Sequence, residues 1–171
     1  MLDNLFKYGK CLSLTKAEHL FSTGDADGNF YILSAGLLKV YYITSEGKEF
    51  VKSFIREGGY IASINAMMST GVCPFNVVAL EDSEIQCIPK ATMLSFQSAD
   101  TTTLKTINLM LLQLVQKKEK REHELLCLSA TERYQAFKNE YSDLEARVSQ
   151  YDIARYLGIT PVALSRIRNR L

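Results

Sequence analysis

The sequence predicts an α+β fold in which strands come first and helices follow. Three observations support this prediction. Short runs of β-forming residues fill the chain to about residue 90, a helical period covers about 91–128, and residues 129–171 divide into three short helices. With 171 residues, of which 47% are hydrophobic, the chain is large enough for a packed core.

Five segments of the N-terminal part are predicted to be strands. Each is rich in β-branched and aromatic residues, and turn sequences rich in Gly and Ser separate several of them. The segments are 30–33, 37–42, 49–55, 77–80 and 84–88. Short strands at this spacing favour a sandwich or a barrel.

A long amphipathic helix is predicted next, from about Ala91 to Leu128. Its apolar residues recur at a 3-4-3 spacing, at Leu104, Ile107, Leu111 and Leu114. Continuing the heptad places the charged residues Lys118 and Arg121 on the same seam. Such a seam either packs on the β-rich part of its own chain or pairs with a second copy, and we expect a homodimer.

The last three helices have recognisable ends. Ser129 and Glu132 have the spacing of a capping box, which opens the first helix. Ser149 or Gln150 opens the second helix, and Gly158 ends it. Thr160 followed by Pro161 opens the third.

The second and third of these helices fit a helix-turn-helix motif. Ala154 is small where the helices would cross, and Gly158 tolerates the positive φ of the turn. An inner stripe is expected at Leu164, Ile167 and Leu171, which leaves an opposite face of Val162, Ser165, Arg166 and Asn169. Arg and Asn are the residue types that pair bidentately with guanine and adenine edges.

The charge distribution agrees with a DNA-binding end. The chain carries 20 Lys plus Arg against 19 Asp plus Glu, but Ile153–Leu171 contains four arginines and no acid. A solvated helix end would show the same charges, so this feature alone favours neither interpretation. We expect phosphate contacts from the polar and basic residues around the motif, Ser149, Gln150, Arg155, Thr160, Arg168 and Arg170.

Little in the sequence supports a membrane protein, a metalloprotein or an enzyme. No apolar run reaches the length of a membrane span and no secretory leader is visible, so we expect a cytoplasmic protein without membrane contacts. The four cysteines and two histidines fit no metal spacing, and no paired acid–base residues or phosphate loop stand out. We therefore expect no cofactor, no metal and no catalysis.

The motifs together resemble the Crp/Fnr family of bacterial transcription regulators, and the C-terminal one is similar to its Bacteroidetes-type members. The marks of the C-terminal motif are 151–154, 157–161 and 164–168. The marks of the N-terminal part are Phe21, Gly24-Asp25, 30–32, Gly36, Lys39-Val40 and 79–84. The resemblance implies an antiparallel β-roll, or double-stranded β-helix, as effector domain over 1–98, a dimerisation helix over 99–128 and a helix-turn-helix domain over 129–171.

The resemblance also implies a function. A homodimer would bind a pseudo-palindromic site on double-stranded DNA, with half-sites about one helical turn apart. Arg166 stands where the family places a base-reading Arg, whereas Val162 replaces a Glu or Arg common near the start of that helix. The alternative is a small-ligand sensor in which DNA binding is weak or vestigial.

The nucleotide-binding residues of the family are missing. Its Gly-Glu pair falls on Ala62-Ser63, and its phosphate-binding Arg falls on Cys73, which Pro74 follows. No Arg or Lys lies between Arg56 and Lys90, and a phosphate without a cation loses its charge-assisted hydrogen bonds. We expect a degenerate pocket that does not hold cyclic AMP tightly and that takes an unknown effector, uncharged or lipid-like, or none.

Overall fold

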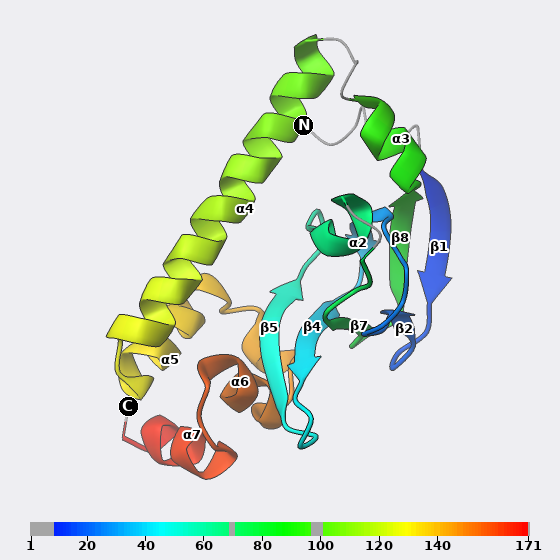
Figure 1. Ribbon diagram of the computed structural model, residues 1–171. Helices are drawn as coiled ribbons and strands as arrows, with labels where there is room; N and C mark the ends of the chain where they lie inside the picture. The colour runs from blue at the N-terminus through cyan, green and yellow to red at the C-terminus, as the bar shows by residue number, and fades with distance from the viewer. Residues whose placement is uncertain (1–8, 69–70, 97–100, 171) are drawn as a thin grey trace.

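Two four-stranded antiparallel sheets form the N-terminal part of the molecule (Figure 1). The computed structural model describes residues 9–68, 71–96 and 101–170. One sheet has the order β1 (Lys10–Leu14), β8 (Ser83–Ile88), β3 (Phe30–Ala35) and β6 (Tyr60–Ala62). The other has the order β2 (His19–Phe21), β7 (Asn76–Ala79), β4 (Leu38–Ile43) and β5 (Glu49–Ile55). The antiparallel β-roll predicted by the family resemblance is confirmed.

The core of the roll lies between these two sheets. Leu33 and Ile85 of one sheet and Leu38, Val40 and Val77 of the other belong to one buried cluster. The turn between β3 and β4 depends on Gly36, which has a φ of +99°. A Cβ there would lie 2.6 Å from the carbonyl oxygen of Asp82, so only glycine fits.

The five predicted strands correspond to β3, β4, β5, β7 and β8. The sequence did not predict β1, β2, β6 or the short helix α2 (Ile64–Met68). β1 is exposed at four of its five positions and β6 has three residues, so neither shows an apolar alternation. Their strand conformation follows from pairing with β8 and β3.

The predicted long helix is two helices, α3 (Lys90–Ser95) and α4 (Thr101–Cys127). The predicted boundary between residues 98 and 99 lies outside the described residues. Met110 of α4 is buried against the roll beside Ile107, and the Tyr60 hydroxyl donates to the Met110 carbonyl at 2.8 Å. Figure 1 shows α4 running from the α3 end of the roll to the C-terminal helices.

The apolar residues of the predicted α4 seam differ in their burial. Ile107 and Leu114 are half-buried, and Ile107 packs on the chain's own core. Leu104 and Leu111 are exposed. Arg121 does not continue the seam, because its guanidinium lies 3.8 Å from the ring centroid of Tyr156 and donates to the Tyr156 carbonyl.

The C-terminal part contains α5 (Ala130–Glu140), a 3₁₀ turn η2 (Leu144–Ala146), α6 (Gln150–Leu157) and α7 (Pro161–Arg168). The capping box at Ser129 is present in full, with both of its reciprocal hydrogen bonds. These helices pack on the outer face of the sheet that ends in β5. Phe54 of β5, Phe137 of α5 and Tyr156 of α6 share one buried aromatic cluster. Within the described ranges, no helix has the length and apolar character needed to cross a membrane.

Candidate nucleic-acid interface

Three local devices hold α6 and α7 in a helix-turn-helix arrangement. The Ser149 hydroxyl accepts from the Asp152 N–H at 3.1 Å and caps α6. Gly158 has a φ of +69° and ends α6, with its N–H bonded to the Ala154 carbonyl. Thr160 caps α7 by accepting from the Ala163 N–H at 3.2 Å. The cap and turn residues are those that the sequence predicts.

The two faces of α7 have different surroundings. Leu164 is buried in the cluster that contains Ile153 and Ala154 of α6, and Ile167 packs against that cluster. Leu171, the third predicted residue of the inner stripe, lies outside the described residues. The opposite face is exposed at every predicted reading position, namely Val162, Ser165, Arg166 and Asn169. Val162 is 62% exposed, so its side chain is available for an apolar contact with a partner.

Several predicted contact residues lie around one surface hollow. Gln150 at the start of α6 and Pro161, Ser165, Arg168 and Asn169 of α7 line a concavity of about 380 Å³. The folding of the chain thus brings Gln150 next to residues 11 to 19 positions away. Ser149 lies beside Gln150, but its hydroxyl is also bonded to Asp152 Oδ2 at 2.7 Å.

Two arginines of the C-terminal segment form ion pairs with acidic residues from other parts of the chain. Arg155 donates to Glu49 Oε2 at 3.1 Å, and Arg168 lies 3.5 Å from Glu145 Oε1. Arg166 and Arg170 are exposed, and the described residues provide neither with an ion pair. Arg155 thus has a partner on the β-roll, and the phosphate contacts expected of Arg155 and Arg168 stay predictions.

A buried charge cluster fixes α6 on the roll. Lys39 of β4 donates to Glu49 of β5 at 2.8 Å and to Asp152 of α6 at 2.9 Å. These three side chains are at most 18% exposed. Burial alone would lower the pKa of Lys39, but the hydrogen bonds to the two carboxylates outweigh burial and raise it.

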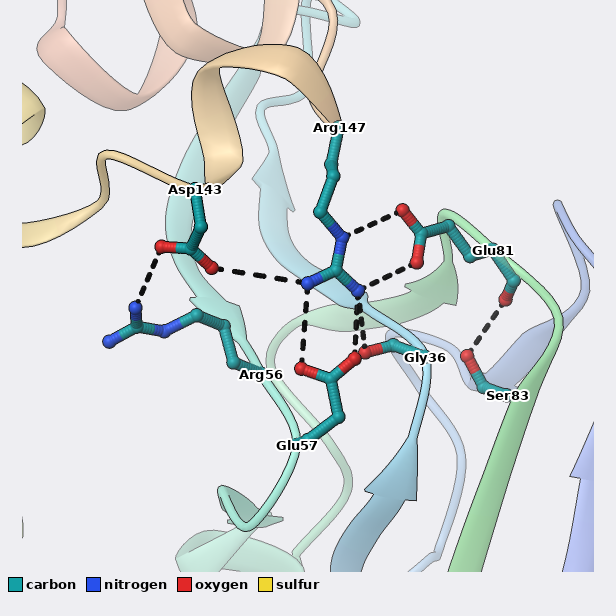
Figure 2. Close-up of polar contacts among 7 residues, drawn as sticks. All are labelled: Gly36, Arg56, Glu57, Glu81, Ser83, Asp143 and Arg147. Carbon is teal, nitrogen blue, oxygen red and sulfur yellow. Dashed lines mark hydrogen bonds and ion pairs between the residues drawn. The ribbon is translucent and has the colours of Figure 1, made fainter.

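A second cluster joins the segment before α6 to the roll, and Figure 2 shows it around Arg147. The Arg147 guanidinium donates to Glu81 at 2.7 and 2.9 Å, to Glu57 at 2.8 Å and to the Gly36 carbonyl at 3.2 Å. Asp143 joins it at 3.9 Å and accepts from Arg56 at 2.9 Å. The hydrogen bonds from Arg147 lower the pKa of Glu57 and of Glu81. Loops from three parts of the roll thus meet one side chain of the C-terminal part.

The predicted effector residues do not present free polar groups. Ser63 and Cys73 are fully buried. The Ser63 hydroxyl accepts from the Ala66 N–H at 3.3 Å, and the Cys73 thiol donates to the Asp27 carbonyl at 3.3 Å. Ala62 is half-buried beside the α4 contact, and Pro74 is exposed.

A cation nevertheless lies beside this segment, and no sequence pattern predicts it. Lys52 of β5 places its ammonium 3.8 Å from the ring centroid of Phe75. The register of β4 and β5 pairs Val40 with Ser53 and Tyr41 with Val51, which leaves Lys52 as the extra residue of a β-bulge. A β-bulge changes the direction in which a side chain points, and the alternation of apolar and polar residues in the sequence does not reveal it.

Among the described residues, no three or more His, Cys, Asp or Glu side chains lie close enough together to bind a metal ion. The cysteines are free thiols; Cys11 and Cys127 are exposed. His19 shares a 2.9 Å hydrogen bond with the Tyr41 hydroxyl, which gives it a structural partner.

Comparison with known proteins agrees with this architecture. The profile of the cyclic nucleotide-binding domain matches residues 11–100. The chain is 29% identical to the fumarate nitrate reduction regulatory protein of Klebsiella oxytoca, over 99% of this chain and 70% of that protein.

Solved structures show the same fold. FixK2 from Bradyrhizobium japonicum superposes with a TM-score of 0.81 at 19% identity, over 95% of this chain and 84% of that one. The global regulator CLP from Xanthomonas campestris gives a TM-score of 0.78 at 14% identity, over 99% and 89%. The chain belongs to the cyclic nucleotide-binding domain family and is homologous to regulators of the Crp/Fnr type.

Proposed function

We propose that the protein is a sequence-specific DNA-binding transcription regulator that acts as a homodimer and has no catalytic activity. One observation carries the proposal. The helix α7 is held from behind by the buried Leu164, while Val162, Ser165, Arg166 and Asn169 stand exposed on its free face. An α-helix presented in this way fits the major groove of B-DNA.

The residues of the interface divide into two roles. Arg166 and Asn169 have the donor and acceptor groups that read guanine and adenine edges, and Val162 offers an apolar contact to a thymine methyl. Ser149, Gln150, Thr160, Arg168 and Arg170 surround the reading face and suit phosphates. Two copies related by a two-fold axis would read a pseudo-palindrome with half-sites about 34 Å apart.

Control of this regulator would not come from a tightly bound cyclic nucleotide. The positions of the family's phosphate cassette hold Ala62, Ser63, Cys73 and Pro74, which supply no charge for a phosphate. A different effector, or none, would set the balance between states of the dimer.

The first prediction concerns Arg166. Selection of random duplex DNA on the full chain supplies the site, and fluorescence anisotropy then compares variants on that site and on a scrambled one. We expect Arg166→Ala to weaken binding to the selected site by about 1–3 kcal/mol and to leave scrambled DNA almost unaffected. Arg170→Ala should weaken both DNAs alike and lower the salt slope by about one.

Lys16→Ala, on the roll, serves as the neutral control. An unchanged affinity of Arg166→Ala for the selected site would remove Arg166 from the reading face. Selection that yields no preferred site, with binding that disappears as salt rises, would favour the alternative of a ligand sensor with vestigial DNA binding.

A further inference from the structure

The hairpin between β4 and β5 lies beside the turn of the helix-turn-helix. Figure 1 shows this hairpin and α7 at the same end of the molecule. A hollow of about 150 Å³ lies between them, and it is lined by the hairpin residues Lys48, Glu49 and Phe50 and by Arg155, Gly158, Ile159 and Thr160. The β-roll therefore contributes to the surface that surrounds the start of α7.

The position of Lys48 is set by the turn that precedes β5. Gly47 has a φ of +78°, and its N–H donates to the Thr44 carbonyl at 2.9 Å. The Lys48 N–H donates to the Thr44 hydroxyl at 3.2 Å, and the Lys48 carbonyl accepts from the Thr44 N–H at 2.9 Å. The backbone of Lys48 is thus held at both of its polar groups, while its side chain is exposed.

The hollow carries an excess of positive charge. Among the described residues that line it, Glu49 is the only acid, and it accepts from Lys39 at 2.8 Å and from Arg155 at 3.1 Å. Lys48 has no carboxylate partner in the part of the chain that the structure describes, and its ammonium lies 4.8 Å from the ring centroid of Phe50. A free cation next to an acid that is already neutralised suits an anionic partner.

This hollow adjoins the proposed reading face. Thr160 lines it, whereas the next residue, Pro161, lines the larger hollow that contains Gln150 and Arg168. An α-helix with its side chains is about 10–12 Å across, close to the width of about 12 Å of the major groove of B-DNA. A helix that fills the groove therefore has a phosphate backbone along each side, and a cation beside the start of α7 lies where such a backbone would pass.

We propose that Lys48 of the β-roll binds a phosphate of the DNA backbone next to the half-site that α7 reads. The roll then contacts DNA directly, in addition to holding the helix-turn-helix in place. Because a phosphate carries the same charge in every sequence, Lys48 contributes affinity and orientation and no base preference. The inference rests on the proposed function and adds to its DNA interface a residue from outside the helix-turn-helix.

The test measures the salt dependence of DNA binding by the full chain. Fluorescence anisotropy gives Kd for the selected and the scrambled duplex between about 50 and 200 mM sodium chloride. Lys48→Met should weaken binding to both duplexes alike, by about two- to fivefold for each lysine removed, and should lower the salt slope by about one for each. Lys10→Met removes the same charge from the exposed strand β1 and should leave Kd and the slope unchanged.

Modified duplexes locate the contact. In each one a single phosphate of the selected site is replaced by an uncharged methylphosphonate. At one position beside each half-site the replacement should weaken the unchanged chain and leave Lys48→Met unaffected, because that variant has already lost the contact. The inference is overturned if every methylphosphonate weakens the two chains alike, or if Lys48→Met keeps the salt slope of the unchanged chain.

Arg166→Ala, measured in the same series, separates this failure from a failure of the proposed function. A loss of specific binding in Arg166→Ala with no effect of Lys48→Met would keep α7 as the reading helix and remove the roll from the DNA interface. An unchanged chain that binds neither duplex would overturn both proposals.

Discussion

At the scale of single residues, Lys52 carries a charge that its surroundings disfavour. Its pKa is about 8 in the folded chain, against 10.5 for a free lysine. Below pH 8 both the folded and unfolded chains hold the proton, so the folded state bears the full cost of burying the charge. Between about pH 8 and 10.5 the folded chain loses this proton first, and stability gains with rising pH.

Replacing this lysine should therefore stabilise the protein, and more so at neutral pH. We expect Lys52→Met to raise the free energy of unfolding by about 1–3 kcal/mol at pH 7, since the ring contacts of Lys52 offset part of the burial cost. The gain should shrink at pH 9.5. Urea unfolding at the two pH values measures it, with Lys105→Met as the control. An equal gain at both values would mean that Lys52 is not the group that titrates.

At the scale of elements, α4 has one face against its own roll and another without a partner among the described residues. Met110 is 4% exposed, whereas Leu111, Leu112 and Val115 are 49%, 57% and 59% exposed. Apolar side chains grouped on one helix arc are characteristic of a contact with another protein, and the proposed occupant is the same arc of a second copy.

Leu111→Glu tests that contact. In a symmetric dimer the change removes two buried leucines and places two carboxylates in the interface, so Kd for dimerisation should rise by about a hundredfold or more. Sedimentation equilibrium measures Kd. Gln113→Glu adds the same charge to another exposed position of α4 and should leave Kd unchanged. A dimer equally stable with Glu at position 111 would place the interface elsewhere.

Elements could be predicted where one local pattern determines them. The β-forming runs of β3 to β5, the cap at Ser129 and the turn at Gly158 depend on neighbours in sequence, and the predictions there agree with the structure. β6, the bulge at Lys52 and the ion pair of Arg155 depend on partners far along the chain. A local sequence pattern cannot identify those partners. The reading face of α7 was therefore predictable, whereas the position of the Lys52 ammonium beside Phe75 was not.

At the scale of the whole molecule, the roll and the helix-turn-helix share one interior. Phe54 and Val51 of β5 belong to the same buried cluster as Tyr156 and Leu157 of α6. The cluster of Lys39, Glu49 and Asp152 lies at the same boundary and leaves each charge paired. We therefore expect the two parts to unfold together and the position of α7 to follow that of β5.

Lys39→Met tests this coupling, because it removes one of the two cations at the boundary and leaves Glu49 and Asp152 with Arg155 alone, while it keeps the apolar stem of the side chain. Breaking a buried ion cluster by removing one partner is costly, and we expect a loss of about 3 kcal/mol in the free energy of unfolding. Hydrogen exchange should accelerate at the amides of both β5 and α6, since each loses the contact that holds it to the other. Lys10→Met, on the exposed strand β1, should change neither quantity. Faster exchange confined to α6 would show that the helix-turn-helix moves apart from the roll.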